Sequence, residues 1–237
     1  MISVCIATYN GGNFIKEQLD SILFQLELGD EIIISDDGSS DNTVEIVESY
    51  QDSRIKIFRN SFKNLISNFE FALKQTKGDY IFFSDQDDIW ETNKVKVCMA
   101  DFEKGYDLVL SDCSIFDSET KEIIHDSFFE FNNSKMGVVN NIVRNSYIGC
   151  CIAFKSKVKS RVLPFPKNIP MHDSWIGIIS ELYFKVNFNK SKLIKYRKHS
   201  KNASHTVTGV SEYSLMKKIS FRLNLIRALI EKYFIFR

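Results

Sequence analysis

Short runs of apolar residues alternate along the chain with stretches in which apolar residues recur every three or four positions. The runs are too short for helices and lie between polar breaks, which is typical of buried strands. We expect strands over residues 2–7, 31–35, 55–58, 80–84 and 108–111. The helical spacing predicts helices over residues 14–26, 44–47 and 65–73. Strands separated by helices indicate an α/β protein with a mainly parallel sheet covered on both faces.

Polar residues follow three of these strands directly. They are Tyr9 and Asn10 after the first strand, Asp36 and Asp37 after the second, and Asp85, Gln86, Asp87 and Asp88 after the fourth. The carboxyl ends of parallel strands meet at one edge of a sheet, where ligands bind. Carboxylates gathered there repel one another, so we expect a divalent cation between them. Mg²⁺ or Mn²⁺ is favoured because these loops contain neither His nor Cys.

Each loop also has a simpler interpretation. Asp36-Asp37-Gly38 is typical of a turn, with Asp41 as the cap of the following helix. The acidic segment 85–88 could equally be a solvated loop. It is the coincidence of three such loops at strand ends that favours a binding site.

Three segments carry a resemblance to a known family. Residues 3–10 (SVCIATYN), 33–43 (IISDDGSSDNT) and 78–90 (GDYIFFSDQDDIW) resemble, in order and spacing, the nucleotide-sugar-binding half of family-2 glycosyltransferases with the GT-A fold. Residues 14–23 (FIKEQLDSIL) and the DQDDIW segment are further similar to the bacterial rhamnosyltransferase-like members, which build surface polysaccharides. The resemblance is strong to about residue 115 and weaker to about 205.

The resemblance implies roles for residues of the first half. Thr8, Tyr9 and Asn10 would border the nucleobase, and Asp37 would accept a hydrogen bond from N3–H of uracil or thymine. Asp85 and Gln86 would hold the ribose or the sugar. Asp87 would bind the metal that bridges the two phosphates. We therefore expect a UDP- or dTDP-sugar donor and Mg²⁺ or Mn²⁺ as cofactor.

The second half contains the expected acceptor side. Pro164, Pro166 and Pro170 indicate a non-helical connector, which the segment 171–175 (MHDSW) follows. By resemblance, Asp173 would be the general base for the acceptor hydroxyl. An alternative from the sequence is that Asp173 caps a helix, which would lower its pKa and weaken it as a base.

Five further residues of this half receive roles from the resemblance. His172 and Trp175 flank the expected base and would contact the acceptor. Gly149, within the segment 145–151, would allow close approach of a sugar, although that segment could equally be a buried strand. In the segment 196–199 (YRKH), Arg197 would offset the diphosphate charge and His199 would reach the metal or a phosphate. A lone histidine is, however, more often structural.

The net charge of +1 conceals two oppositely charged halves. Residues 1–118 contain 22 acidic and 10 basic residues, whereas residues 119–237 contain 8 and 21. We expect residues 1–118 to bind the nucleotide sugar and residues 119–210 to bind the acceptor within the same domain. Residues 211–237 form a basic amphipathic helix, with Leu215, Ile219, Leu223, Ile226 and Ile230 on one face. This helix would lie on an anionic membrane surface, on its own domain or on a second subunit.

Cysteine usage and hydropathy suggest where the protein works. Five cysteines without CxxC spacing favour a reducing compartment over a disulfide framework or a zinc site. We expect neither a cleaved signal peptide nor a membrane-spanning segment. The expectation is a cytoplasmic enzyme, peripheral on the inner face of the membrane and with no nucleic-acid partner.

The sequence thus predicts an inverting glycosyltransferase with a glycan or lipid-linked acceptor. A metal-dependent nucleotidyltransferase would use similar carboxylates and stays open as the alternative. A non-catalytic binding module is the third possibility, for which only the capping interpretation of Asp173 argues. The absence of a GxGxxG motif after the first strand and of a P-loop disfavours nicotinamide and P-loop enzymes.

Overall fold

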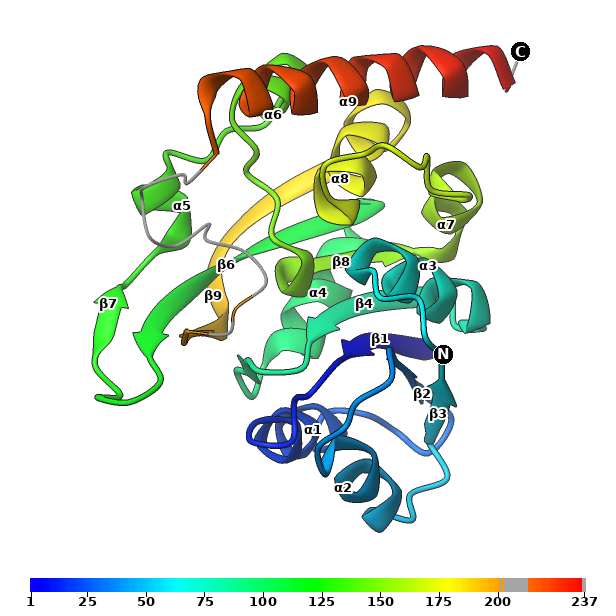
Figure 1. The fold of residues 1–237 in the computed structure, drawn as a ribbon, viewed down its shortest axis with the longest axis vertical. Coiled ribbons are helices and arrows are strands. Elements are labelled where there is room, and N and C mark those ends of the chain that lie inside the picture. Colours follow the sequence, from blue (N-terminus) through cyan, green and yellow to red (C-terminus); the bar gives the residue numbers. More distant parts are fainter. Residues whose placement is uncertain (201, 203–212, 236–237) are drawn as a thin grey trace.

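A single mixed sheet runs through the molecule, with helices on both faces (Figure 1). The computed structural model describes residues 1–200, 202 and 213–235, with the side chains of 233–235 excluded. The strands are β1 (Ile2–Thr8), β2 (Glu31–Asp36), β3 (Ile55–Arg59), β4 (Tyr80–Asp85), β5 (Ile89–Trp90), β6 (Leu108–Asp117), β7 (Ile123–His125), β8 (Ile152–Lys155) and β9 (Val186–Lys198). The order in the sheet is β3-β2-β1-β4-β8-β6-β9-β5, and β7 pairs with β6.

The strands of the N-terminal half are parallel and those beyond β4 are mixed. β1 pairs in parallel with β2 and β4, and β2 with β3. β8 is antiparallel to both β4 and β6, whereas β9 runs parallel to β6. The predicted α/β class with a mainly parallel mixed sheet is therefore confirmed. The short strands β5 and β7 were not predicted, because two or three residues carry too little periodicity to be recognised.

The helices are α1 (Ile15–Leu23), α2 (Thr43–Ser49), α3 (Leu65–Gln75), α4 (Lys94–Glu103), α5 (Phe128–Asn132), α6 (Val138–Val143), α7 (Ser156–Val162), α8 (His172–Tyr183) and α9 (Leu215–Ile235). Four of them, α1, α2, α3 and α9, overlap the segments in which the apolar spacing predicts helices, whereas α4 to α8 were not predicted. Residue Asn42, rather than Asp41, is the N-cap of α2, although the Asp41 carboxylate accepts a hydrogen bond from Thr43 N. Among the described residues, no helix is long and apolar enough to cross a bilayer.

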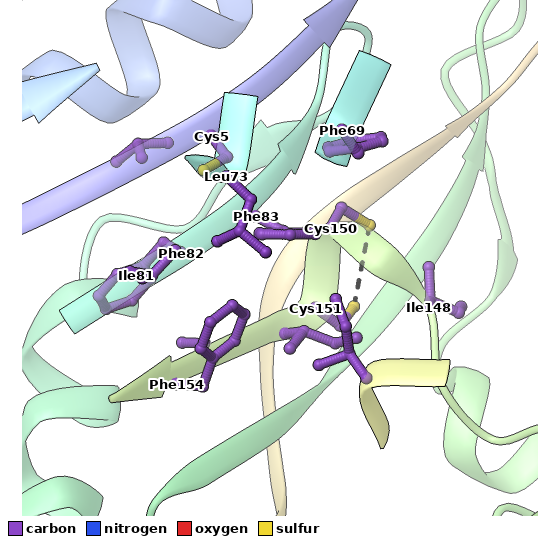
Figure 2. Close-up of a cluster of buried hydrophobic side chains, with 14 of the residues drawn as sticks. Cys5, Phe69, Leu73, Ile81, Phe82, Phe83, Ile148, Cys150, Cys151 and Phe154 are labelled. Carbon is purple, nitrogen blue, oxygen red and sulfur yellow. Dashed lines mark hydrogen bonds between the residues drawn. The ribbon is translucent and has the colours of Figure 1, made fainter. Parts of the chain in front are cut away.

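Strand β4 shows why the core holds helices on both faces. Successive side chains of a strand point to opposite sides. Phe83 stacks on Phe69 of α3 with ring centroids 5.1 Å apart, while Phe82 packs against Trp90 and against Phe102 of α4. Figure 2 shows Phe69, Phe82 and Phe83 within one cluster of buried side chains beside this strand. The packing fixes β4, and thereby the acidic loop at its carboxyl end.

Two local expectations from the sequence are wrong. The segment that contains Gly149 is not a strand: Gly149–Cys151 form a 3-10 turn, and β8 begins only at Ile152. Asp173 does not cap α8, because Met171 is the N-cap residue and Asp173 lies inside the first turn. The prolines do occupy a non-helical connector between α7 and α8, as expected. Ser211, the predicted start of the last helix, lies outside the described residues, and α9 begins at Leu215.

Candidate active site

A cavity of about 820 Å³ lies at the carboxyl ends of β1 and β4. Most of the predicted site residues line it. They are Thr8, Tyr9, Asp37, Asp85, Gln86, Asp87, Gly149, His172 and Asp173. The first six follow β1, β2 and β4, and the last three come from the turn before β8 and from the start of α8. Sheet topology thus brings together residues that are more than 160 positions apart.

The first strand loop is held against the acidic loop by its backbone. The Gln86 side chain accepts a hydrogen bond from Tyr9 N at 2.9 Å and donates one to Tyr9 O at 3.1 Å. Gly11 lies against the same amide, since a Cβ there would come within 2.3 Å of Gln86 Oε1. The ring of Tyr9 is 59% exposed and lines the cavity. Gln86 therefore positions this loop and leaves an aromatic face available for stacking.

Thr8 and Asn10 play a supporting part in this loop. Thr8 Oγ1 donates to Asp36 Oδ2 at 2.8 Å, so its hydroxyl is engaged inside the protein. Asn10 is not among the residues that line the cavity; its Oδ1 accepts a hydrogen bond from Ser40 N at 2.8 Å. Asn10 links the loops after β1 and β2 rather than facing the cavity.

The two aspartates after β2 differ in their surroundings. Asp36 accepts hydrogen bonds from Thr8 and from the backbone of Gly38 and Ser39, which makes it part of the turn. Asp37 lines the cavity, and its two oxygens accept from Lys63 N and Asn64 N, each at 2.9 Å. Sequence reasoning missed these two donors, because they precede α3 and carry no motif. They hold the Asp37 carboxylate in one orientation at the cavity wall.

The acidic loop after β4 is closed by the end of β9. His199 Nε2 lies 2.9 Å from Asp87 Oδ2, so the two predicted metal ligands are adjacent. His199 also stacks on Phe14, with ring centroids 4.6 Å apart. Asn202 donates to the carbonyl of Arg197 and accepts from His199 N, which fixes the chain beyond β9. Phe14 and Asn202 had no sequence signal for this role.

Arg197 is placed differently from the expectation. Its side chain is buried and is not among those that line the cavity. Nε donates to Asp87 O at 2.7 Å, a terminal nitrogen lies 2.5 Å from Glu17, and the backbone nitrogen donates to Asp88 Oδ1. Arg197 therefore holds the acidic loop against α1 and β9, and its guanidinium points at protein groups rather than at a diphosphate.

The acidic loop contains two carboxyl groups whose pKa values are raised. Burial raises the pKa of Asp85 to about 8, and the negative charges of Asp87 and Asp173 add to the rise. Asp88 is fully buried and its pKa is raised by burial and by Asp87 and Asp85. A cation beside these carboxylates would reverse the rise by favouring their charged forms. Oxygen donors of this kind suit Mg²⁺ or Mn²⁺.

A second group of possible ligands lies deeper, where Asp85, Asp88 and Cys150 bring ligand atoms within 4.8 Å of one another. The sequence did not place Cys150 here, since it lies 62 positions beyond Asp88. Burial raises the pKa of the Cys150 thiol, which stays protonated, and a neutral thiol is a poor ligand for a hard cation. Figure 2 shows its sulfur beside that of Cys151, 4.0 Å away. Cys150 is thus a core residue beneath the acidic loop.

Asp173 lies across the cavity from the acidic loop. Its side chain is almost fully buried, and burial raises its pKa to about 7, against hydrogen bonds from the Ser174 backbone and the Asn145 side chain that lower it. A carboxyl whose pKa lies near neutrality is suited to take a proton. The cavity therefore contains a residue with the chemistry of a general base.

His172 and Trp175 differ in access to the cavity. His172 stacks on Phe69, with ring centroids 4.2 Å apart, and packs against Phe83. It lines the cavity, and burial lowers its pKa to about 3, so its ring is neutral. Among the described residues, neither ring nitrogen has a hydrogen-bond partner. Gly149 lets the ring lie close, since a Cβ there would be 2.9 Å from Nε2. Trp175 is instead in the core, donates Nε1–H to Val162 O at 2.9 Å, and is placed for packing rather than for acceptor contact.

The sequence is similar to those of known glycosyltransferases. A family model described as glycosyl transferase family 2 matches residues 3–163. A UDP-Glc:alpha-D-GlcNAc-diphosphoundecaprenol beta-1,3-glucosyltransferase of Escherichia coli is 30% identical over 70% of this chain and 64% of its own length. A dTDP-rhamnosyl transferase of Shigella flexneri is 44% identical over 38% of this chain and 34% of its own length.

The fold is likewise similar to that of a solved glycosyltransferase structure. Staphylococcus aureus TarS 1-349 in complex with UDP-GlcNAc matches with a TM-score of 0.68 and 20% identity, over 90% of this chain and 61% of that one. The chain spans about a third to two thirds of the length of the curated relatives it matches. The sheet, the acidic loop after β4 and the family match lead to one conclusion: the chain belongs to glycosyl transferase family 2.

Proposed function

We propose that this protein transfers a sugar from a UDP- or dTDP-sugar to a glycan or lipid-linked acceptor in the biosynthesis of a bacterial surface polysaccharide, with inversion at the anomeric carbon. The observation that carries the proposal is the position of Asp173, a buried carboxyl with a pKa of about 7 that lines the same cavity as Asp85 and Asp87. The donor types follow the names of the Escherichia coli and Shigella flexneri relatives.

The donor would bind along the carboxyl ends of β1, β2 and β4. The exposed ring of Tyr9 offers a stacking surface to the base, and the fixed Asp37 carboxylate has lone pairs left for N3–H of uracil or thymine. Cytosine has no hydrogen on N3, so this contact would discriminate against it. Asp85 and Gln86 would lie beside the ribose or the sugar.

Asp87 and His199 would hold a divalent cation, with Asp85 close by. When bound, the cation neutralises the diphosphate and stabilises the charge of the leaving nucleoside diphosphate. Arg197 and Gln86 contribute by fixing the acidic loop from both sides. Burial and the neighbouring charges of Asp87 and Asp173 raise the pKa of Asp85, and a cation beside it would lower that pKa and favour the charged carboxylate.

The chain's own catalytic step is a proton transfer at Asp173. The acceptor hydroxyl oxygen forms a bond to the anomeric carbon, its proton moves to the Asp173 carboxylate, and the bond to the diphosphate oxygen breaks with its electron pair. One displacement from the face opposite the leaving group inverts the anomeric configuration. His172 is neutral, and its ring nitrogens have no hydrogen-bond partner in the described part of the chain, so it would hydrogen-bond an acceptor hydroxyl beside Asp173.

A thermal-shift screen of nucleotide sugars, with and without Mn²⁺, tests the proposal. A donor present at 100 times its Kd stabilises the native state by about 2.7 kcal/mol. We expect UDP- or dTDP-sugars to raise the melting temperature in Mn²⁺, and GDP- and CMP-sugars to leave it unchanged. A metal-dependent nucleotidyltransferase would instead release inorganic pyrophosphate from a nucleoside triphosphate and a sugar phosphate, and that product would overturn the proposal.

A further inference from the structure

Helix α9 has two apolar faces, and only one of them packs against the domain. Leu225 and Ala228 are 3% and 4% exposed. Two hydrogen bonds secure this inner face, from Arg222 to Val143 O of α6 and from Lys232 to Leu163 O, each at 2.6 Å. Figure 1 shows α9 lying across one end of the molecule, over α6 and α8. The inner face thus accounts for the attachment of the helix.

The other apolar face is exposed along its whole described length. The exposed fractions are 73% for Leu215, 46% for Ile219, 59% for Leu223, 40% for Ile226 and 53% for Ile230. At about 100° per residue these five side chains fall within an arc of about 80°, roughly opposite Leu225 and Ala228. We call them the outer stripe. A helix that packs on its domain normally exposes a polar face, so the outer stripe needs another partner.

The charges around the outer stripe indicate the nature of that partner. Residues 213–232 contain five basic residues and one acidic residue, Glu231. At about 100° per residue, Arg222 and Arg227 lie within about 40° of the two edges of the outer stripe and Lys218 lies about 60° from one edge, whereas Lys217 lies on the opposite side of the helix. Arg227 is exposed and pairs with Glu231, and Lys218 and Arg222 are partly exposed. Lys and Arg beside an apolar stripe reach the headgroups of a bilayer while the stripe enters its interface. Basic residues near an anionic membrane are attracted to its surface and strengthen binding.

A second copy of the chain fits this surface less well. In a two-fold symmetric dimer the same patch meets itself, so pairing of the outer stripes would place Arg222 and Arg227 of both copies close together. Like charges opposed in this way destabilise an interface. The neighbouring helix α6 adds exposed apolar side chains at Val139 and Val143, which widens the apolar surface beside α9.

The outer stripe is apolar and basic side chains lie beside it. We infer that this face of α9 binds the surface of an anionic membrane, with the helix parallel to the bilayer. The inference goes beyond the proposed function, because it concerns a surface that no residue of the cavity shares. It explains why the apolar spacing of this helix continues on a side that does not contact the domain.

Vesicle flotation of the full chain tests the inference, with no nucleotide sugar or acceptor present. We expect binding to vesicles of phosphatidylcholine with 30% phosphatidylglycerol, and at least tenfold weaker binding to phosphatidylcholine alone. The double variant Leu223→Ser/Ile226→Ser should bind the anionic vesicles at least tenfold more weakly. Phe24→Ser/Leu28→Ser is the matched control, because both side chains are exposed and lie away from α9.

The charge contribution is measured separately. Lys218→Gln/Arg227→Gln should weaken binding to the anionic vesicles about tenfold or more, whereas Lys96→Gln/Lys190→Gln, which removes two exposed lysines elsewhere, should not. All replaced side chains are exposed or partly exposed, so far-UV circular dichroism and thermal melts should match those of the wild type. Equal vesicle binding by both serine variants would overturn the inference, as would a dimer that only Leu223→Ser/Ile226→Ser dissociates. Vesicle binding is independent of sugar transfer, so failure of one proposal leaves the other standing.

Discussion

Asp87 and His199 are 112 positions apart in the chain, and their side chains lie 2.9 Å apart at Oδ2 and Nε2. The contact joins the acidic loop after β4 to the end of β9. Arg197, two residues earlier, also donates a hydrogen bond to the carbonyl of Asp87. Two contacts therefore hold the acidic loop against the end of β9. The geometry of the proposed cation site therefore depends on β9 as much as on the acidic loop.

Replacement of Asp87 tests the cation site directly. Asp87→Asn keeps the shape of the side chain but removes its charge, so Mn²⁺ binding should weaken at least tenfold in isothermal titration. Transfer should fall by a factor of 10² or more. His199→Gln should weaken Mn²⁺ binding less, since one neutral ligand is lost. The site assignment would be wrong if Asp87→Asn bound Mn²⁺ like the wild type.

Asp173→Asn should abolish transfer while the donor still binds. An amide cannot take the acceptor proton, and loss of a general base costs about 10²–10⁴ in rate. The thermal shift produced by the nucleotide sugar should match that of the wild type, which separates catalysis from binding. Transfer at a near-normal rate by this variant would contradict the base assignment.

The pH dependence of transfer should report the same carboxyl. Only the ionised form of Asp173 accepts a proton, and its pKa is raised to about 7. The rate at saturating donor and acceptor should therefore rise with pH, reach half its maximum near pH 7, and level off above pH 8. A rate that is flat between pH 5 and 8 would mean that another group takes the proton.

The free energy of unfolding should change with pH in the opposite direction to the transfer rate, because ionisation of the buried Asp173 destabilises the fold. The folded pKa of Asp173 lies above its ordinary value of 3.8, so its contribution to stability is fully present below about pH 4 and is lost as the pH rises through 7. Asp173→Asn stays neutral at every pH and should melt at a higher temperature than the wild type at pH 8. The difference, of order 4 kcal/mol at most, should shrink toward pH 4. Thermal melts of both proteins across this range measure it.

His172 offers a test of acceptor contact. Its neutral ring lies in the cavity wall with both nitrogens unpartnered among the described residues. His172→Phe fills the same space without a polar atom and should raise KM for the acceptor about tenfold, with the KM for the nucleotide sugar unchanged. His172→Asn, which keeps a donor and an acceptor, should recover part of the loss. Equal KM values in all three proteins would leave His172 as a packing residue only.

The sequence by itself determined the strand and helix pattern and the loops that carry the acidic residues. Buried strands and amphipathic helices have periodicities that local residues set, so β1, β2, β4, α1 and α3 were predictable. The rule that parallel strands present their carboxyl ends at one edge also placed Tyr9, Asp37 and Asp87 together before any coordinates. The position of Asp173 at the same site followed only from the family resemblance.

Tertiary structure decided what each side chain faces. Trp175 and Arg197 are residue types that often line binding sites. Long-range packing instead buries Trp175 in the core, where it donates to Val162 O, and Arg197 contacts Glu17 and Asp87. Cys150 reached the acidic loop because β8 pairs with β4, which no local pattern indicates. The same holds for α9: spacing predicted its apolar residues, and only the packing of Leu225 and Ala228 left the outer stripe exposed. Periodicity is a local property, whereas burial and the pKa shifts of Asp85 and Asp173 arise from neighbours far away in the chain.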